Sequence, residues 1–266
     1  MQAYLDTAIK AAQAAGLIIR QRFGSQLQVR HKGRIDLVTE VDLACENELR
    51  RVILTDWPEH AILGEEGGAQ GHSNALWIVD PLDGTRSFAH GYPFVCVSVA
   101  LEIDGRVEVG VVYDPIRDEL FHAVRGGGAF LNGQTITVSA TDSLEQALLV
   151  TGFPYHLAEF DSTAFFAMFR DFVVSSGGIR RDGSAALDFC YIASGRLDGY
   201  WEFFLNPWDA AAGALIAQEA GARLTNLGGG DYDIRVAELL VSNGLIHEAM
   251  LAVAAPHLGQ MRGLLG

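Results

Sequence analysis

The chain has 266 residues, of which 49% are hydrophobic and 20% charged, so it is long enough to bury a large core and belongs to the globular class. Its net charge of −14 disfavours a direct nucleic-acid-binding surface, because phosphate backbones are bound by clusters of Lys and Arg. An acidic protein binds an anionic substrate only where local cations, bound metals or helix N-termini reverse the field.

The N-terminal region is predicted to be helical. Apolar residues at helical spacing predict an amphipathic helix over residues 3–23, ending near Gly24. A polar stretch from Gln28 to Asp36 follows and leads into a second helix from about Glu40 to Thr55. In a chain otherwise short of positive charge, this stretch contains four basic residues: Arg30, His31, Lys32 and Arg34.

From Ala61 to Val138 the pattern changes to short apolar runs separated by Asp-Gly, Asp-Pro and Gly-Gly turns. The strands expected here are Ala75 to Val79, Phe94 to Leu101, Val107 to Tyr113 and Glu119 to Val124. Short runs joined by tight turns are typical of a mainly antiparallel sheet.

After Leu144 strands and helices alternate. The expected elements are strand 147–151, helix 161–174, helix 184–195, strand 198–204, helix 209–220, strand 238–242 and helix 245–257. This pattern predicts an α/β half over residues 145–266, beside N-terminal helices and a mainly antiparallel sheet over residues 1–144. A ligand site is expected at the seam between the two halves.

Cysteine usage and the absence of a targeting segment indicate a cytoplasmic protein. Cys45, Cys96 and Cys190 are widely separated and form no C-x-x-C pair, so we expect them to fill the core in a reducing compartment. Asp6 and Lys10 lie in the first turns, where a secretory signal needs an uninterrupted apolar core. No run approaches the roughly 20 apolar residues of a membrane span, so no membrane partner is expected.

Two carboxylates follow one apolar run closely. In Trp77-Ile-Val-Asp80-Pro81-Leu82-Asp83-Gly84-Thr85, Pro81 keeps Asp80 extended and Gly84 permits a sharp turn. Across such a turn Asp80 and Asp83 can point into one space, with the Leu82 carbonyl oxygen between them. Either they cradle a cation, or they accept hydrogen bonds from backbone amides in a plain turn.

Two further acids are candidates for the same site. Glu65 follows the apolar run Ala61 to Leu63, and Asp209 lies at a predicted helix start. Alternatively, Glu65 is a surface residue and Asp209 only an N-cap. All-oxygen donors favour magnesium or manganese over zinc, and magnesium binds through a few carboxylates, waters and substrate phosphate, which indicates phosphoryl-transfer chemistry.

Five motifs in this order resemble the inositol monophosphatase family of magnesium-dependent, lithium-sensitive phosphatases, and the resemblance covers nearly the whole chain. They are Asp36-Leu-Val-Thr39-Glu-Val-Asp42, Gly64-Glu65-Glu66, Trp77 to Thr85, Gly183-Ser184-Ala185-Ala186-Leu187-Asp188, and Trp208-Asp209 preceded by Glu202. The resemblance implies a layered αβαβα sandwich of the sugar-phosphatase type, of α+β or α/β class.

The resemblance also implies roles for individual residues. Glu65, Asp80 and the Leu82 carbonyl would bind one magnesium ion, and Asp80, Asp83 and Asp209 a second. Glu65 and Thr85, with Asp42 behind them, would position the attacking water. The remaining substrate contacts would come from this set: Leu82, Asp83, Gly84, Thr85, Arg180, Gly183, Ser184, Ala185, Glu202 and Asp209.

By the same resemblance we expect a cytoplasmic homodimer that uses two or three Mg²⁺ ions, with Mn²⁺ as an alternative, to hydrolyse a small phosphorylated polyol such as myo-inositol 1-phosphate. Relatives of this type also act on histidinol phosphate, fructose 1,6-bisphosphate or nucleotide phosphates. A different class of function is partner binding, because a bacterial relative is also a component of a transcription complex. The loop Lys32 to Asp36, Asp182 and Gly152 to Pro154 depart from the animal enzymes, and these departures concern substrate choice.

Overall fold

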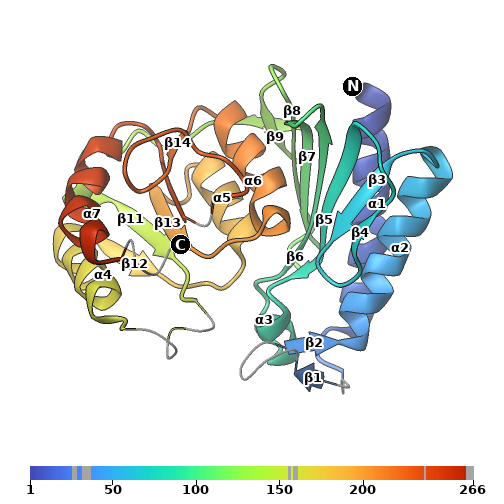
Figure 1. The fold of residues 1–266 in the computed structure, drawn as a ribbon, viewed down its shortest axis with the longest axis horizontal. Helices are drawn as coiled ribbons and strands as arrows, with labels where there is room; N and C mark the ends of the chain where they lie inside the picture. The colour runs from blue at the N-terminus through green and yellow to red at the C-terminus, as the bar shows by residue number, and fades with distance from the viewer. Residues whose placement is uncertain (26–28, 32–36, 155–156, 158–160, 237, 262–266) are drawn as a thin grey trace.

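Five layers alternate between helices and sheets across the computed structural model, which describes residues 1–25, 29–31, 37–154, 157, 161–236 and 238–261 (Figure 1). Helices α1 (Gln2–Arg22) and α2 (Glu40–Asp56) form one outer layer, and α4 (Thr163–Ser175) and α7 (His247–Met261) form the other. Helices α5 (Ala185–Ala193) and α6 (Pro207–Glu219) lie between the two sheets. The αβαβα sandwich expected from the resemblance is confirmed.

The first sheet has eight strands in the order β10-β9-β8-β7-β6-β5-β3-β4. Their bounds are β3 Ala61–Gly64, β4 Gly68–Gln70, β5 Ala75–Asp83, β6 Cys96–Ile103, β7 Arg106–Asp114, β8 Glu119–Val124, β9 Ala129–Leu131 and β10 Gln134–Ile136. All pairs are antiparallel except β3 with β5, because β4 turns back along β3 before the chain enters β5. A small separate sheet pairs β1 (Val29–His31) with β2 (Leu37–Thr39).

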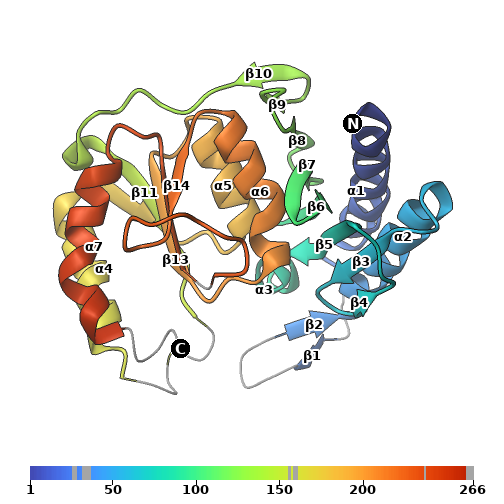
Figure 2. The same cartoon turned by 45° about the horizontal axis from the view of Figure 1, so that its top comes forward.

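The second sheet has five strands in the order β12-β11-β13-β15-β14. Their bounds are β11 Leu148–Thr151, β12 Gly178–Arg180, β13 Gly199–Phe203, β14 Arg223–Thr225 and β15 Glu238–Ser242. Strand β11 is parallel to both β12 and β13, whereas β15 is antiparallel to β13 and β14. Figure 2 shows the connection from β10 running across the molecule into β11, past the helices between the sheets. A 3-10 turn, η1 (Leu144–Gln146), precedes β11.

Helix α6 is buried on all sides and joins the two sheets. Residues Ala210–Ala217 are buried throughout, and α6 packs on α5 and on β6, β7 and β8. Two glycines allow this approach: a Cβ atom on Gly110 of β7 would lie 2.7 Å from the Ala212 oxygen, and one on Gly213 would lie 2.7 Å from the Phe189 Cβ. The largest core cluster accordingly includes residues from both sheets, such as Ile78 and Tyr200.

The observed elements differ from the expected ones mainly at their ends. Strand β5 does not stop near Val79 but continues to Asp83, with an irregular register against β6 between Asp80 and Asp83. Strand β6 begins at Cys96 rather than Phe94. The three cysteines are free and buried, as expected. Within the described ranges, no helix is long and apolar enough to cross a membrane.

Candidate active site

A cavity of about 520 Å³ lies where β5 ends, beside the first turns of α5 and α6. Its wall contains every predicted site residue except Asp42 and Arg180. The predicted residues that line it are Glu65, Asp80, Leu82, Asp83, Gly84, Thr85, Gly183, Ser184, Ala185, Glu202 and Asp209. Motifs far apart along the chain therefore meet in one space.

The irregular end of β5 fixes the first two carboxylates. Asp80 and Asp83 are both buried, and Asp80 Oδ1 accepts a hydrogen bond of 3.0 Å from the Leu82 amide. Gly84 then adopts a φ of +93° and is the N-cap of the short helix α3 (Thr85–Ala89). A side chain at position 84 would be strained at this φ and would lie 2.7 Å from the Phe94 carbonyl oxygen, so glycine is required.

Asp83 is held by the first turn of α5, across the space between the layers. Its Oδ2 accepts hydrogen bonds of 2.8 Å from the Ser184 hydroxyl and from the Ala186 amide. Ser184 is also the N-cap of α5, where its hydroxyl accepts from the Leu187 amide at 3.4 Å. The Gly183 to Ala186 motif thus orients a carboxylate as well as lining the cavity.

Thr85 lines the cavity and is hydrogen-bonded to the buried Asp42, which does not line it. The Thr85 hydroxyl lies 2.9 Å from Asp42 Oδ1 and 3.1 Å from the Leu82 carbonyl oxygen. Asp42 Oδ2 accepts from the Thr39 amide at 2.8 Å and from its hydroxyl at 2.6 Å, in a capping box at the start of α2. Asp42 is fully buried and does not line the cavity, which agrees with the expected position behind Thr85.

The loop that carries Glu65 is fixed by α2. Glu46 of α2 accepts hydrogen bonds from the amides of Glu66, at 2.8 Å, and Gly67, at 2.9 Å. Arg50, one turn further on, pairs with Glu46 at 2.8 Å. No motif in the sequence points to Glu46, because its role depends on the packing of α2 against this loop.

Asp209 is the third residue of α6 and not its N-cap. The helix begins at Pro207, its N-cap is Asn206, and Asp209 Oδ2 accepts a 2.7 Å hydrogen bond from the Asn206 amide. The carboxylate therefore lies in the first turn of the helix and faces the cavity beside Trp208.

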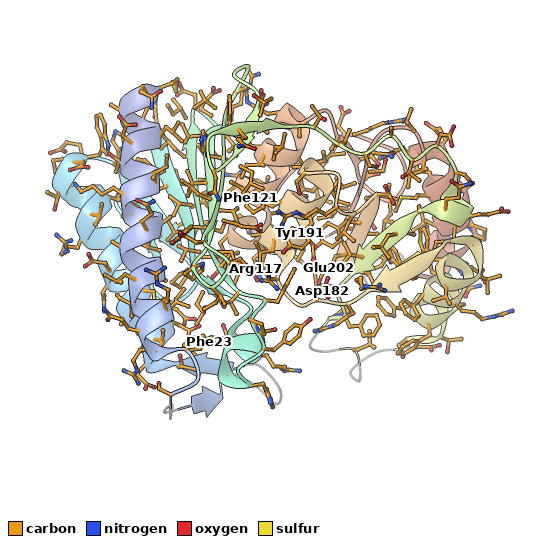
Figure 3. All side chains as sticks on the ribbon, turned by 180° about the vertical axis from the view of Figure 1, so that it is seen from behind. Phe23, Arg117, Phe121, Asp182, Tyr191 and Glu202 are labelled. Atoms are coloured by element: carbon orange, nitrogen blue, oxygen red, sulfur yellow. The ribbon has the colours of Figure 1, made fainter. Side chains whose placement is uncertain are left out.

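Glu202 lies on β13, in another part of the cavity wall. The Tyr200 hydroxyl donates a 2.5 Å hydrogen bond to Glu202 Oε2, and a Cβ atom on Gly152 would lie only 1.7 Å from Glu202 Oε1. Position 152 must therefore be glycine for the carboxylate to occupy this place. Figure 3 labels Glu202 and Asp182 close to one another in the middle of the molecule.

The basic residues are placed differently from the expectation. Arg180 is exposed and its guanidinium bonds the adjacent Ile179 carbonyl, whereas the next residue, Arg181, lines the cavity with its guanidinium 5.9 Å from the centre of the Phe153 ring. Lys32, Arg34 and Asp36 lie outside the described residues. Asp188, four residues after Ser184, also lines the cavity. Helical spacing from Ser184 puts Asp188 on the same face of α5, a signal present in the sequence.

The acids around the cavity raise one another's pKa. Burial raises the pKa of Asp80 well above its usual value, and the charges of Glu65, Asp83 and Asp209 raise it further. Burial also raises the pKa of Asp83 to about 6, against hydrogen bonds from Ala186 and Ser184 that lower it. Burial and then Asp83 raise the pKa of Asp209. Such a set of acids is stabilised by a bound cation.

The chemistry of the donors fits a hard cation such as magnesium. All are oxygens, and in Asp80, Asp83 and Asp209 a protein donor fixes one carboxylate oxygen. Within the described part of the chain, no three His, Cys, Asp or Glu side chains form a ready-made metal cluster.

Comparison with known proteins agrees with this geometry. Residues 1–259 match the model of the inositol monophosphatase family. The chain is 43% identical to the Nus factor SuhB of Pseudomonas aeruginosa, over 97% of this chain and 98% of that protein, and 44% identical to the inositol-1-monophosphatase of Synechocystis, over 94% and 88%. It is similar in structure to an inositol monophosphatase from Anabaena, with a TM-score of 0.87 and 40% identity over 96% of both chains.

Proposed function

The chain belongs to the inositol monophosphatase family, and is thus a phosphoric monoester hydrolase, and we propose that it hydrolyses a small phosphorylated polyol, with myo-inositol 1-phosphate as the first candidate. One observation carries the proposal: Glu65, Asp80, Asp83 and Asp209 line the same cavity as Glu202. The four carboxylates suit a phosphate bound through hard cations, and Glu202 suits the hydroxyl groups of the alcohol.

We assign magnesium, as two or three ions, to this acid set, with manganese as the alternative. Glu65, Asp80 and the Leu82 carbonyl would hold one ion, and Asp80 with Asp83 and Asp209 a second. When bound, the metal supplies charge neutralisation of the phosphate, a more acidic water and stabilisation of the leaving alkoxide.

The protein's own residues position the reactants. The Thr85 hydroxyl donates a hydrogen bond to Asp42, so the lone pairs of the threonine oxygen are left to accept a hydrogen bond from a water in the cavity. Glu65, fixed by the Glu46-bound loop, accepts the second hydrogen of that water. The water oxygen then forms its bond to phosphorus in line with the departing alkoxide as the bond from phosphorus to the alkoxide oxygen breaks, without a covalent intermediate on the enzyme. Glu65 accepts the proton that the water loses, and the alkoxide takes up a proton from solvent water.

A phosphate-release assay across a panel of phosphate monoesters tests the proposal. Myo-inositol 1-phosphate should be hydrolysed with magnesium and not with excess chelator. Asp80→Asn should lower turnover by orders of magnitude with an unchanged far-UV circular dichroism spectrum, because this carboxylate is assigned to both ions. Full activity in chelator, or wild-type turnover in the variant, would contradict the metal assignment. Inhibition by lithium at high magnesium is expected as well.

The other substrates in the panel are histidinol phosphate, fructose 1,6-bisphosphate and a nucleotide phosphate. A nucleotide needs a stacking surface near the cavity, and the aromatic residue that lines it beside Arg181 is Phe153, whose ring packs against Phe165, Phe166 and Phe169. The highest kcat/KM in the panel identifies the preferred class.

We further propose a cytoplasmic homodimer and a second function in a transcription complex. The second function is favoured by relatives at 41% to 43% identity that are named Nus factor SuhB. Binding of the purified protein to a reconstituted transcription complex tests it. If Asp80→Asn binds like the wild type, the two functions are separate, and absence of binding would contradict the second one.

A further inference from the structure

One carboxyl group beside the cavity has an oxygen without a partner. Asp188 of α5 is 1% exposed. Of the side chains that the structure describes, two have a buried polar atom without a hydrogen-bond partner, Ser176 Oγ and Asp188 Oδ1. Only Asp188 of these two lines the main cavity.

Buried aspartates elsewhere in the chain are satisfied by the protein. Asp198 accepts from the Ser139 hydroxyl at 2.5 Å and from the Leu148 amide at 2.7 Å, and Asp114 accepts from two backbone amides and Arg117. These contacts fix loops and strand ends. Because a buried carboxyl oxygen without a partner destabilises the fold, Asp188 differs from aspartates whose role is structural.

The surroundings of Asp188 are mostly acidic. Burial raises the pKa of Asp188 well above its usual value, Glu202, Asp182 and Asp83 raise it further, and Arg181 lowers it. Among these neighbours, Glu202 has the largest effect on the pKa of Asp188, and it lines the same cavity. Two carboxyl groups from α5 and β13 are therefore close together in the region assigned to the alcohol part of the substrate.

We propose that Asp188 is a specificity-determining residue that forms a hydrogen bond with a substrate hydroxyl adjacent to the one bound by Glu202. The pair would then select phosphate monoesters whose alcohol carries vicinal hydroxyl groups. This inference rests on the proposed function, since it requires a polyol phosphate as substrate. A bound hydroxyl also supplies the partner that Asp188 Oδ1 lacks within the protein.

Steady-state kinetics of Asp188→Ala and Asp188→Asn on two substrates test the proposal. For myo-inositol 1-phosphate, Asp188→Ala should raise KM and lower kcat/KM about 10- to 100-fold, because a hydrogen bond to a polar buried group is lost. Asp188→Asn, which keeps one carbonyl oxygen as acceptor, should recover part of that loss. Both variants should hydrolyse 4-nitrophenyl phosphate, which has no hydroxyl group, like the wild type.

Asp104→Asn is the matched control, because it removes a negative charge from an exposed turn that does not line the cavity, at a positive φ that asparagine tolerates. It should leave the ratio of the two substrates unchanged. The melting temperature of substrate-free Asp188→Asn should equal or exceed that of the wild type, whereas a structural role predicts a decrease.

The kinetics of the variants and of the wild type separate failure of this inference from failure of the proposed function. Equal losses on both substrates or unchanged kinetics in Asp188→Ala, or a lower melting temperature in Asp188→Asn, would overturn the role of Asp188 alone. A wild type that hydrolyses 4-nitrophenyl phosphate but no polyol phosphate would overturn the proposed substrate and, with it, this inference.

Discussion

Glu202 is held from two sides before any substrate binds. The Tyr200 hydroxyl fixes Oε2, and the missing side chain of Gly152 leaves room for Oε1. Burial raises its pKa to about 7, against Tyr200 and Arg181, which lower it. A carboxyl group with this pKa changes from hydrogen-bond donor to pure acceptor close to neutral pH.

Glu202→Gln should therefore weaken hydrolysis of polyol phosphates more than that of an aryl phosphate. The expected loss in kcat/KM is about 10- to 100-fold, the value of a hydrogen bond to a charged group. In the wild type, KM for the polyol phosphate should fall as pH rises through about 7, because the carboxylate form accepts the hydroxyl protons.

The variant provides the control for this pH dependence, since glutamine does not titrate. For this variant, KM for the polyol phosphate divided by KM for 4-nitrophenyl phosphate should not change with pH. The division corrects for ionisation of the substrate's phosphate group. Parallel profiles in wild type and variant would assign the pH dependence to another group.

At this scale the sequence predicted most of the acids that line the cavity but not its basic side. Asp80 and Asp83 were predictable because they follow an apolar run, and Asp209 because it lies at a predicted helix start. Arg180 and Arg181 are adjacent, and successive side chains at the end of a strand point to opposite faces. Which of the two faces the cavity depends on the position of β12 beside β11, which a single sequence does not determine.

Among the elements, α6 is the one that both holds a site residue and joins the layers. It carries Asp209 in its first turn and packs on β7 through Gly110. Because this contact is already close, an added methyl group cannot be accommodated without moving the helix or the strand.

Gly110→Ala should lower stability by about 1–3 kcal/mol, the usual cost of overpacking a core. In a chain of this length that corresponds to a fall in melting temperature of about 2–12 °C, at about 2–4 °C for each kcal/mol. Turnover should fall with it, because a displaced α6 moves Asp209. Thermal melts and initial rates measure both effects.

Gly259→Ala is the matched control. Gly259 lies in α7, and an added Cβ atom meets no atom within 4 Å. Alanine is favoured over glycine in a helix, so this variant should melt at the same temperature as the wild type or higher. A decrease as large as that of Gly110→Ala would show that the contact with α6 is not the cause.

The elements themselves were largely predictable, and the exceptions have physical reasons. Helices such as α1 and α2 and long strands such as β7 have enough residues for a period to be recognised. Strands β9, β12 and β14 have three residues each, too few to show alternation. Strand β5 extends beyond its apolar run because β6 continues to pair with it around the irregularity.

The whole molecule shares one large core between its two sheets. Ile78 and Phe121 from the first sheet belong to the same buried cluster as Tyr200 and Val241 from the second. The division into residues 1–144 and 145–266 stays a prediction, and this shared cluster leads us to expect that the two parts unfold together. Calorimetry should give one transition with equal calorimetric and van't Hoff enthalpies. Two resolved transitions would show independent domains.

The acid-lined cavity makes the stability of the metal-free protein depend on pH. Burial raises the pKa of Glu202 from 4.5 to about 7 and that of Asp80 and Asp209 well above 3.8. A carboxyl group with a raised pKa binds more protons in the folded state, so its stabilising contribution is lost as pH rises through the folded pKa. The folded protein should therefore lose stability as these carboxyl groups ionise without a cation.

His247 has the opposite effect on stability at lower pH. Burial lowers its pKa to about 4, so its contribution to the stability of the folded state grows as pH rises to about 6.5. Melting temperatures should therefore be compared between about pH 6.5 and 8.5, where the carboxyl groups with raised pKa dominate the pH dependence of stability.

In chelator, the melting temperature should fall across this window. Saturating magnesium should remove most of the fall, since a cation compensates the charges and binds only the folded site, with a gain of about 2.7 kcal/mol at 100 times the dissociation constant. Asp83→Asn should melt higher than the wild type in chelator and gain less from magnesium. A wild-type melting temperature that magnesium does not change at pH 8.5 would show that these carboxylates do not form one cation site.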